Sequence, residues 1–149
     1  MVKYKYKLEG LLKLRKFKES HLKVELGTIN QSMTEVKNQL SKLRDNIKST
    51  YHDQEKVLSS AASGQMAQFY PYYIQGQRED IKNKESLLYS LEKKYEKKLE
   101  ELSTAMAESK LINNMKEKDF NDYKKKLEKK QEGMREDLNQ ITRLFKEQQ

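Results

Sequence analysis

The sequence predicts an all-α protein, a long antiparallel two-helix coiled-coil hairpin with a C-terminal helical overhang. Three observations predict it: an apolar seam, a single break in the helical periodicity, and arms of unequal length around that break. The seam alternates spacings of four and three residues, about 3.5 per repeat, over Leu22, Leu26, Ile29, Met33, Val36, Leu40, Leu43 and Ile47. Such a seam cannot bury itself, and the other arm is the nearest partner, at high effective concentration.

The first helix is expected over about residues 5–59. Leu8 and Leu12 keep the register of the later seam, whereas Arg15 and Glu19 interrupt it. A second apolar stripe lies beside the seam near the start of the helix and consists of Leu11, Leu14 and Phe17. The helix should therefore have a wide apolar face near its start and a narrow seam further on.

The break is expected over about residues 60–71, where small and polar residues replace the apolar pattern. Gly64 suits the C-terminus of a helix, and Pro71 suits the first turn of a new one. Together these signals predict a connector that ends at the proline.

An aromatic cluster surrounds Pro71 and is too dense for an ordinary exposed turn. Two interpretations are open for these side chains: they cap the end of the hairpin seam, or they contact a partner. We expect capping by Tyr70 and Tyr72, and partner contact by Phe69 and Tyr73.

The second helix is expected over about residues 72–146, and residues 1–149 together should form one coiled-coil domain. Its apolar stripe includes Ile74, Ile81, Leu88, Leu91, Tyr95, Leu99, Leu102, Met106, Ile112, Met115, Phe120, Tyr123 and Leu127. The step from Leu91 to Tyr95 to Leu99 is four plus four, which predicts a stutter that locally unwinds the supercoil.

The second arm is longer than the first. With the turn centred near Gly64, Lys3 should lie opposite about Lys126, and the residues after Leu127 should overhang by about 30 Å at 1.5 Å per residue. The overhang carries a regular apolar stripe of Met134, Leu138, Ile141 and Phe145. The stripe is either a docking surface or oligomer contact, or the fraying end of a helix that merely continues the pattern.

The sequence offers no candidate catalytic, metal-binding or cofactor-binding residues, so we expect no enzymatic activity and no cofactor. It has no cysteine, and its two histidines, His21 and His52, are too far apart to share a metal ion. It shows no glycine-rich phosphate loop, and a two-helix hairpin encloses no pocket in which a pKa could be tuned. We also expect neither a secretory signal nor a membrane span.

The net charge is +8, and only five of the 31 basic residues are arginine. Lysine-rich helices more often present a solvated face than a nucleic-acid reader. Near the N-terminus, however, Lys3, Lys5 and Lys7 alternate with Tyr4 and Tyr6, a pattern that could grip single-stranded nucleic acid, form a short strand, or be the frayed start of the first helix. We favour the frayed start. A basic nucleic-acid-binding coiled coil and a generic structural rod that dimerises through its overhang remain alternative functions.

The beginning of the chain resembles that of the flagellar export protein FliJ family, through Tyr6-x-Leu8-Glu9-x-Leu11-Leu12-x-Leu14-Arg15. The length, the unequal helical arms and the Tyr73–Ile74 restart of the second helix extend this resemblance over nearly the whole chain. One departure is Asn139–Gln140 after Leu138, where the family usually has an acidic pair, so no charge-dependent role is carried over to these two residues.

The resemblance implies a component of the flagellar type III export apparatus, cytoplasmic and peripheral to the cell membrane at the flagellar base. It implies three partners: the hexameric export ATPase, the cytoplasmic domain of the export gate, and substrate chaperones. The gate-facing residues would be Phe69, Tyr73, Gln77, Asp80 and Lys84. The ATPase-facing residues would be Leu11, Leu14, Phe17, Met134, Leu138, Ile141 and Phe145.

Overall fold

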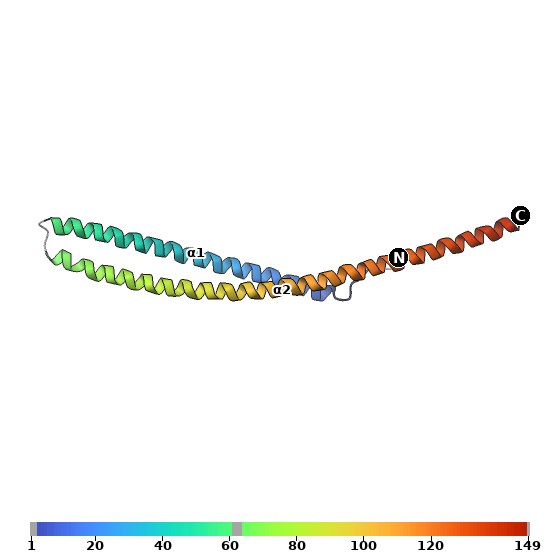
Figure 1. Ribbon diagram of the computed structural model, residues 1–149, viewed down its shortest axis with the longest axis horizontal. Coiled ribbons are helices and arrows are strands. Elements are labelled where there is room, and N and C mark those ends of the chain that lie inside the picture. Colours follow the sequence, from blue (N-terminus) through green and yellow to red (C-terminus); the bar gives the residue numbers. More distant parts are fainter. Residues whose placement is uncertain (1–2, 61–63, 149) are drawn as a thin grey trace. The chain divides into compact units, whose positions relative to one another are not determined.

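The computed structural model describes residues 3–60 and 64–148 of the chain. This part of the chain forms two helices and no strand: α1 spans Glu9–Ser59 and α2 spans Gly64–Glu147 (Figure 1). The two helices pack against each other, which confirms the predicted all-α hairpin. The chain divides into two compact units, which we call the loop unit, His21–Leu102, and the terminal unit, Met1–Ser20 with Ser103–Gln149. That residues 1–149 act as one domain stays a prediction.

In the loop unit both helices keep the spacing of three and four residues that defines a coiled coil. The most buried side chains of α1 are Leu22, Leu26, Ile29, Val36 and Leu40. On α2 the seam runs through the buried or half-buried positions Tyr70, Ile74, Gln77, Ile81, Lys84, Leu88, Leu91, Tyr95, Lys98 and Leu102. The pairing is antiparallel, because Arg44 lies 3.1 Å from Glu85 while the earlier Glu25 lies 2.9 Å from the later Lys98.

The predicted stutter at Leu99 is wrong, because the seam passes through Lys98 instead. Leu99 is 48% exposed, whereas the Lys98 side chain is only 26% exposed. The lysine stem can occupy a seam position because its ammonium group forms ion pairs with Glu25 and, at 3.3 Å, with Glu101. The heptad spacing on α2 is therefore uninterrupted here.

Helix α2 begins at Gly64, which corrects the expected connector over 60–71 and the expected helix start at 72. Gly64 is the first residue of α2 and not the end of α1; residues 61–63 lie outside the described part of the chain. Pro71 lies inside the helix. Proline removes one backbone hydrogen bond there, but half-buried Tyr70 and buried Ile74 keep the seam on either side of it, and the ring itself is exposed.

In the terminal unit, the most buried side chains are Leu12 and Ala105, each 1% exposed. The buried positions of α2 in this unit are Ala105, Ser109 and Ile112. Ion pairs flank this core: Arg15 lies 2.6 Å from Glu108 and Glu9 lies 2.8 Å from Lys116. Arg15 therefore does not merely interrupt the apolar pattern, because it sits half-buried at a seam position and bonds across to α2.

From Lys124 to Gln148, every residue is exposed. We call these residues the tail; they are helical through Glu147. The N-terminal segment lies beside α2 near Asp119 and Tyr123 and not near Lys126, the position expected for Lys3. The overhang therefore starts slightly earlier than the residue after Leu127.

Candidate partner-binding surfaces

The tail presents a narrow apolar stripe to solvent. Its members, which we call the tail stripe, follow spacings of seven, four, three and four residues and are Leu127, Met134, Leu138, Ile141 and Phe145. At 100° per residue these positions fall on one face of the helix. Phe145 is 70% exposed, and the exposure of the other stripe residues agrees with the sequence-based expectation of uncovered apolar surface.

The tail stripe is not a continuation of the hairpin seam. The seam of the terminal unit runs through Ala105, Ser109, Ile112 and Lys116. Extended with the same heptad spacing, it would reach the mostly polar positions Asp119, Tyr123, Lys126, Lys130, Gly133, Asp137, Gln140 and Leu144. The tail stripe lies one residue out of phase with this series, about 100° around the helix. It is therefore a separate surface.

The start of α1 presents a second apolar surface in the terminal unit. Leu14 and Phe17 are largely exposed, and Leu11 is also on the exposed side of the helix. Leu12, between them in sequence, is instead buried in the core. The helix thus separates a core-facing leucine from an outward apolar stripe, as the sequence predicted.

The N-terminal segment is anchored on α2 through Tyr4, so the expectation of a frayed first turn of α1 is wrong. Residues 3–6 have no regular structure, and α1 begins at Glu9 rather than at residue 5. The Tyr4 hydroxyl donates a 2.8 Å hydrogen bond to Asp119, and its ring lies 5.0 Å from that of Phe120 and 5.1 Å from that of Tyr123. Aromatic contacts of this kind offset the cost of ordering an extended segment.

The same contacts change the ionisation of Tyr4. Burial first, and then the hydrogen bond to the Asp119 carboxylate, raise the pKa of Tyr4 to about 12. Tyr6 anchors the segment further, because its hydroxyl donates to the carbonyl oxygen of Ile112 at 3.3 Å. The alternating Lys–Tyr pattern therefore serves packing: the tyrosines face α2, and Lys3, Lys5 and Lys7 are exposed.

The aromatic cluster of the loop unit lies on the first turns of α2. Phe69 is 65% exposed and stacks on Tyr73 at 6.1 Å between ring centroids. Half-buried Tyr70 is at a seam position, as capping requires. The capping role expected for Tyr72 is wrong, because Tyr72 is 79% exposed. The helix continues through Pro71, and this continuation turns Tyr72 away from α1.

The residues expected to face the export gate differ in how exposed their side chains are to solvent. Asp80 is exposed, whereas Gln77 and Lys84 are half-buried at seam positions. Gln77 donates a 2.7 Å hydrogen bond from Nε2 to the Tyr73 hydroxyl. Beside these residues, Phe69 and Tyr72 are largely exposed and Tyr73 is 42% exposed.

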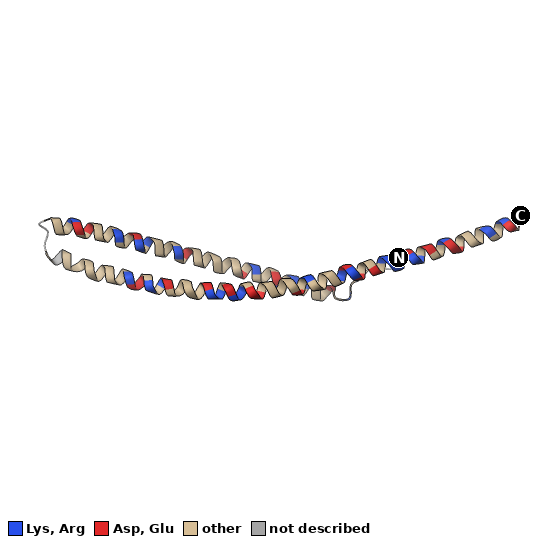
Figure 2. Cartoon of the chain, in the orientation of Figure 1, with Lys and Arg blue, Asp and Glu red and all other residues tan. Residues whose placement is uncertain are grey.

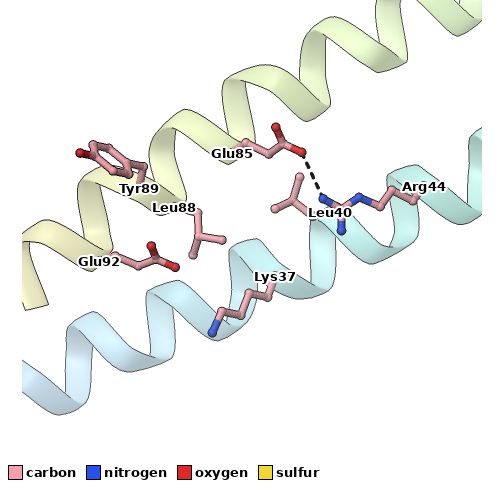
Figure 3. Close-up of a pocket in the computed structure, with 7 residues that line it drawn as sticks. All are labelled: Lys37, Leu40, Arg44, Glu85, Leu88, Tyr89 and Glu92. Carbon is pink, nitrogen blue, oxygen red and sulfur yellow. Dashed lines mark hydrogen bonds and ion pairs between the residues drawn. The ribbon is translucent and has the colours of Figure 1, made fainter.

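A shallow groove of about 380 Å³ lies between the helices of the loop unit (Figure 3). Leu40 and Leu88 lie at its centre, and the Arg44–Glu85 ion pair spans one end. Its remaining lining side chains are Lys37, Tyr89 and Glu92. This lining contains charges and apolar side chains but no nucleophile–base pair, and within residues 3–60 and 64–148 no group of three His, Cys, Asp or Glu side chains could hold a metal ion.

Charge is spread along both helices, with basic and acidic residues interspersed (Figure 2). Several of these charges are used within the hairpin, where they pair across the helices. None of the helices in the described ranges is long and apolar enough to cross a membrane.

These features define a helical-hairpin scaffold whose exposed apolar surfaces suit it to bind other proteins. The family model described as flagellar FliJ protein matches residues 4–144, and the chain belongs to this family. No curated protein and no solved structure matches the chain. Family membership makes the protein a component of the flagellar type III export apparatus, and it indicates a location on the cytoplasmic side of the flagellar base.

Proposed function

We propose that this protein links the export ATPase ring to the export gate and escorts substrate chaperones, while peripherally associated with the membrane at the flagellar base. It does so through separate contact surfaces on a helical scaffold and has no catalytic role of its own. The single observation that carries the proposal is the exposure of apolar side chains on surfaces that the hairpin core does not use.

The ATPase-facing surface belongs to the terminal unit. It comprises two apolar stripes, one at the start of α1 and one on the tail: Leu11, Leu14, Phe17, Met134, Leu138, Ile141 and Phe145. Apolar stripes on helices are the usual means by which a helix docks into a groove of a partner.

The gate-facing surface belongs to the loop unit. Phe69 and Tyr73 supply a stacked, exposed aromatic pair, and Asp80 adds an exposed charge on the same stretch of α2. Aromatic residues often provide most of the affinity in protein interfaces. Gln77 and Lys84 are half-buried, so we assign them supporting contacts at the edge of this surface.

The ATPase contact is tested by Leu138→Asp in the full-length protein, with Asn139→Asp as the matched control. Both variants add one negative charge to exposed neighbouring positions, but only the first removes an apolar side chain from the tail stripe. Loss of a buried leucine contact of about 1.5–3 kcal/mol weakens binding by roughly 10- to 100-fold. Affinity for the purified ATPase is measured by calorimetry. Equal affinities of the two variants would refute a contact through the tail stripe.

The gate contact is tested separately by Phe69→Ala, with Tyr89→Ala as the control at another exposed aromatic position of α2. Binding to the purified cytoplasmic domain of the gate protein should weaken about tenfold for the first variant and little for the second. If the two variants bind alike, the aromatic start of α2 is not the gate-facing surface.

A further inference from the structure

The geometry of the tail points to a second use: we propose that the tail stripe is self-complementary and pairs antiparallel with the tail of a second copy of this chain. This inference does not rest on the proposed function, because it concerns contacts between two copies alone. Its first support is that the tail has a heptad seam of its own, out of phase with the hairpin seam.

The tail seam, residues 120, 124, 127, 131, 134, 138, 141 and 145, fits itself when two copies are aligned antiparallel about a centre between residues 132 and 133. The apolar layers then place Leu138 opposite Leu127 of the second copy, and Phe145 opposite Phe120, which precedes the tail and is 37% exposed beside Tyr4 of its own chain. The other layers each pair one polar with one apolar side chain. Gln131 lies opposite Met134 near the centre of the alignment, and Lys124 lies opposite Ile141 further out. The Lys124 ammonium already lies 4.7 Å from the Phe120 ring centroid, which leaves its aliphatic stem for the layer.

Charges beside this seam select the antiparallel arrangement. In the same alignment, Glu128 faces Arg135 of the second copy, and Lys130 faces Asp137. The two-fold axis repeats each attraction, so four ion pairs flank the layers. A parallel pair would instead place Lys130 against Arg135 twice and would oppose association.

Pairing of two tails buries the tail stripe, which the proposed ATPase contact also uses. The two interactions therefore exclude each other, and a free copy would exchange its tail partner for the ring. Charge variants can distinguish tail pairing from the ATPase contact. Substitutions of Glu128 and Arg135 change charges that flank the seam but leave the apolar side chains of the tail stripe in place.

The test is sedimentation equilibrium of the full-length chain at low salt, across about two decades of concentration. We expect a monomer–dimer equilibrium. Glu128→Lys places a lysine against Arg135, and Arg135→Glu places a glutamate against Glu128, so each should weaken the dimer about tenfold. The double variant exchanges the two charges and should restore the affinity of the original chain.

Matched controls lie on the opposite face of the tail helix. Glu136→Lys and Arg143→Glu make the same charge changes at positions that face solvent in the proposed dimer, and each should alter the dimer affinity by less than about twofold. A protein that stays monomeric throughout the concentration series would overturn the proposal. A dimer that the Glu128 and Arg135 variants weaken no more than the controls would overturn it as well.

The orientation has its own measurement, because the chain contains no cysteine and a single label can be introduced by Arg143→Cys. In the antiparallel dimer two nitroxides at this position lie roughly 30 Å apart along the helix axis, whereas a parallel dimer brings them side by side. A short label-to-label distance by electron spin resonance would overturn the antiparallel arrangement.

Discussion

Truncation of Leu12 is the most direct test of how α1 divides its apolar residues between core and surface. Leu12 is 1% exposed and is the largest fully buried side chain of the described residues. The buried α2 positions in its unit include the small residues Ala105 and Ser109, which cannot expand to fill a void. Leu12→Ala should therefore destabilise the protein by about 3 kcal/mol, within the range of leucine truncations in well-packed cores.

Leu14→Ala is the matched control, since it makes the same chemical change two residues along the same helix at a largely exposed side chain. It should change the free energy of unfolding by less than about 0.5 kcal/mol. Both are measured by urea unfolding followed by helical circular dichroism, with hydrogen exchange to locate the effect in the terminal unit. A loss below about 1 kcal/mol for Leu12→Ala, or equal losses for both variants, would refute the division of core and surface described for this helix.

Three further predictions concern other features of the fold. The hydrogen bond from Lys98 lowers the pKa of Glu25 below its ordinary value of 4.5, so the stability that this pair contributes should be present above that pH and be lost as the pH falls below it. Lys98→Met should reduce the fall of stability in urea titrations at low pH, and the part that remains comes from Glu9, whose pKa is lowered by its hydrogen bond with Lys116. An unchanged slope in Lys98→Met would contradict the assignment. The pKa of Tyr4 is raised to about 12, so ultraviolet titration should show one late-ionising tyrosine that disappears in Tyr4→Phe. If the late component persists, it belongs to another residue. Pro71→Ala should restore a backbone hydrogen bond of α2 and stabilise the protein by about 1–3 kcal/mol in thermal unfolding, whereas a lower melting temperature would show that the proline is required.

The hairpin was predictable because a coiled coil is encoded by periodicity alone. The seam of α1, from Leu22 to Leu40, needs no knowledge of tertiary contacts to be recognised, and the break before Gly64 supplies the second helix. The exposure of Leu14, Phe17 and the tail stripe was also predictable, because these positions lie outside the hairpin seam or beyond the length of the first arm.

Other features depend on pairing that one sequence does not display. By hydropathy alone, Leu99 is a better seam residue than Lys98. Lys98 occupies the seam position because its ammonium group forms ion pairs with Glu25 and Glu101, which the sequence alone does not reveal. Likewise, a proline usually marks a helix boundary, but the seam residues on both sides of Pro71 keep the helix intact.

The N-terminal segment was the least predictable element, because its order comes from residues more than a hundred positions away. Tyr4 contacts Asp119, Phe120 and Tyr123. A signal was present in the sequence, namely two tyrosines at alternate positions before the helix and two aromatic residues, Phe120 and Tyr123, on α2. Without a register for the hairpin, these could not be matched.

The attachment of Tyr4 to α2 also determines how the molecule should respond to mechanical force. A helical hairpin pulled apart at its chain ends opens like a zipper, one turn at a time. Here the first bonds to carry the load are the hydrogen bond to Asp119 and the contacts with Phe120 and Tyr123, which lie ahead of the leucine core at Leu12. A force applied between the tail and the N-terminus therefore acts on the Tyr4 contacts before it acts on the leucine core. The hairpin should stay closed until the contacts of Tyr4 with Asp119, Phe120 and Tyr123 break.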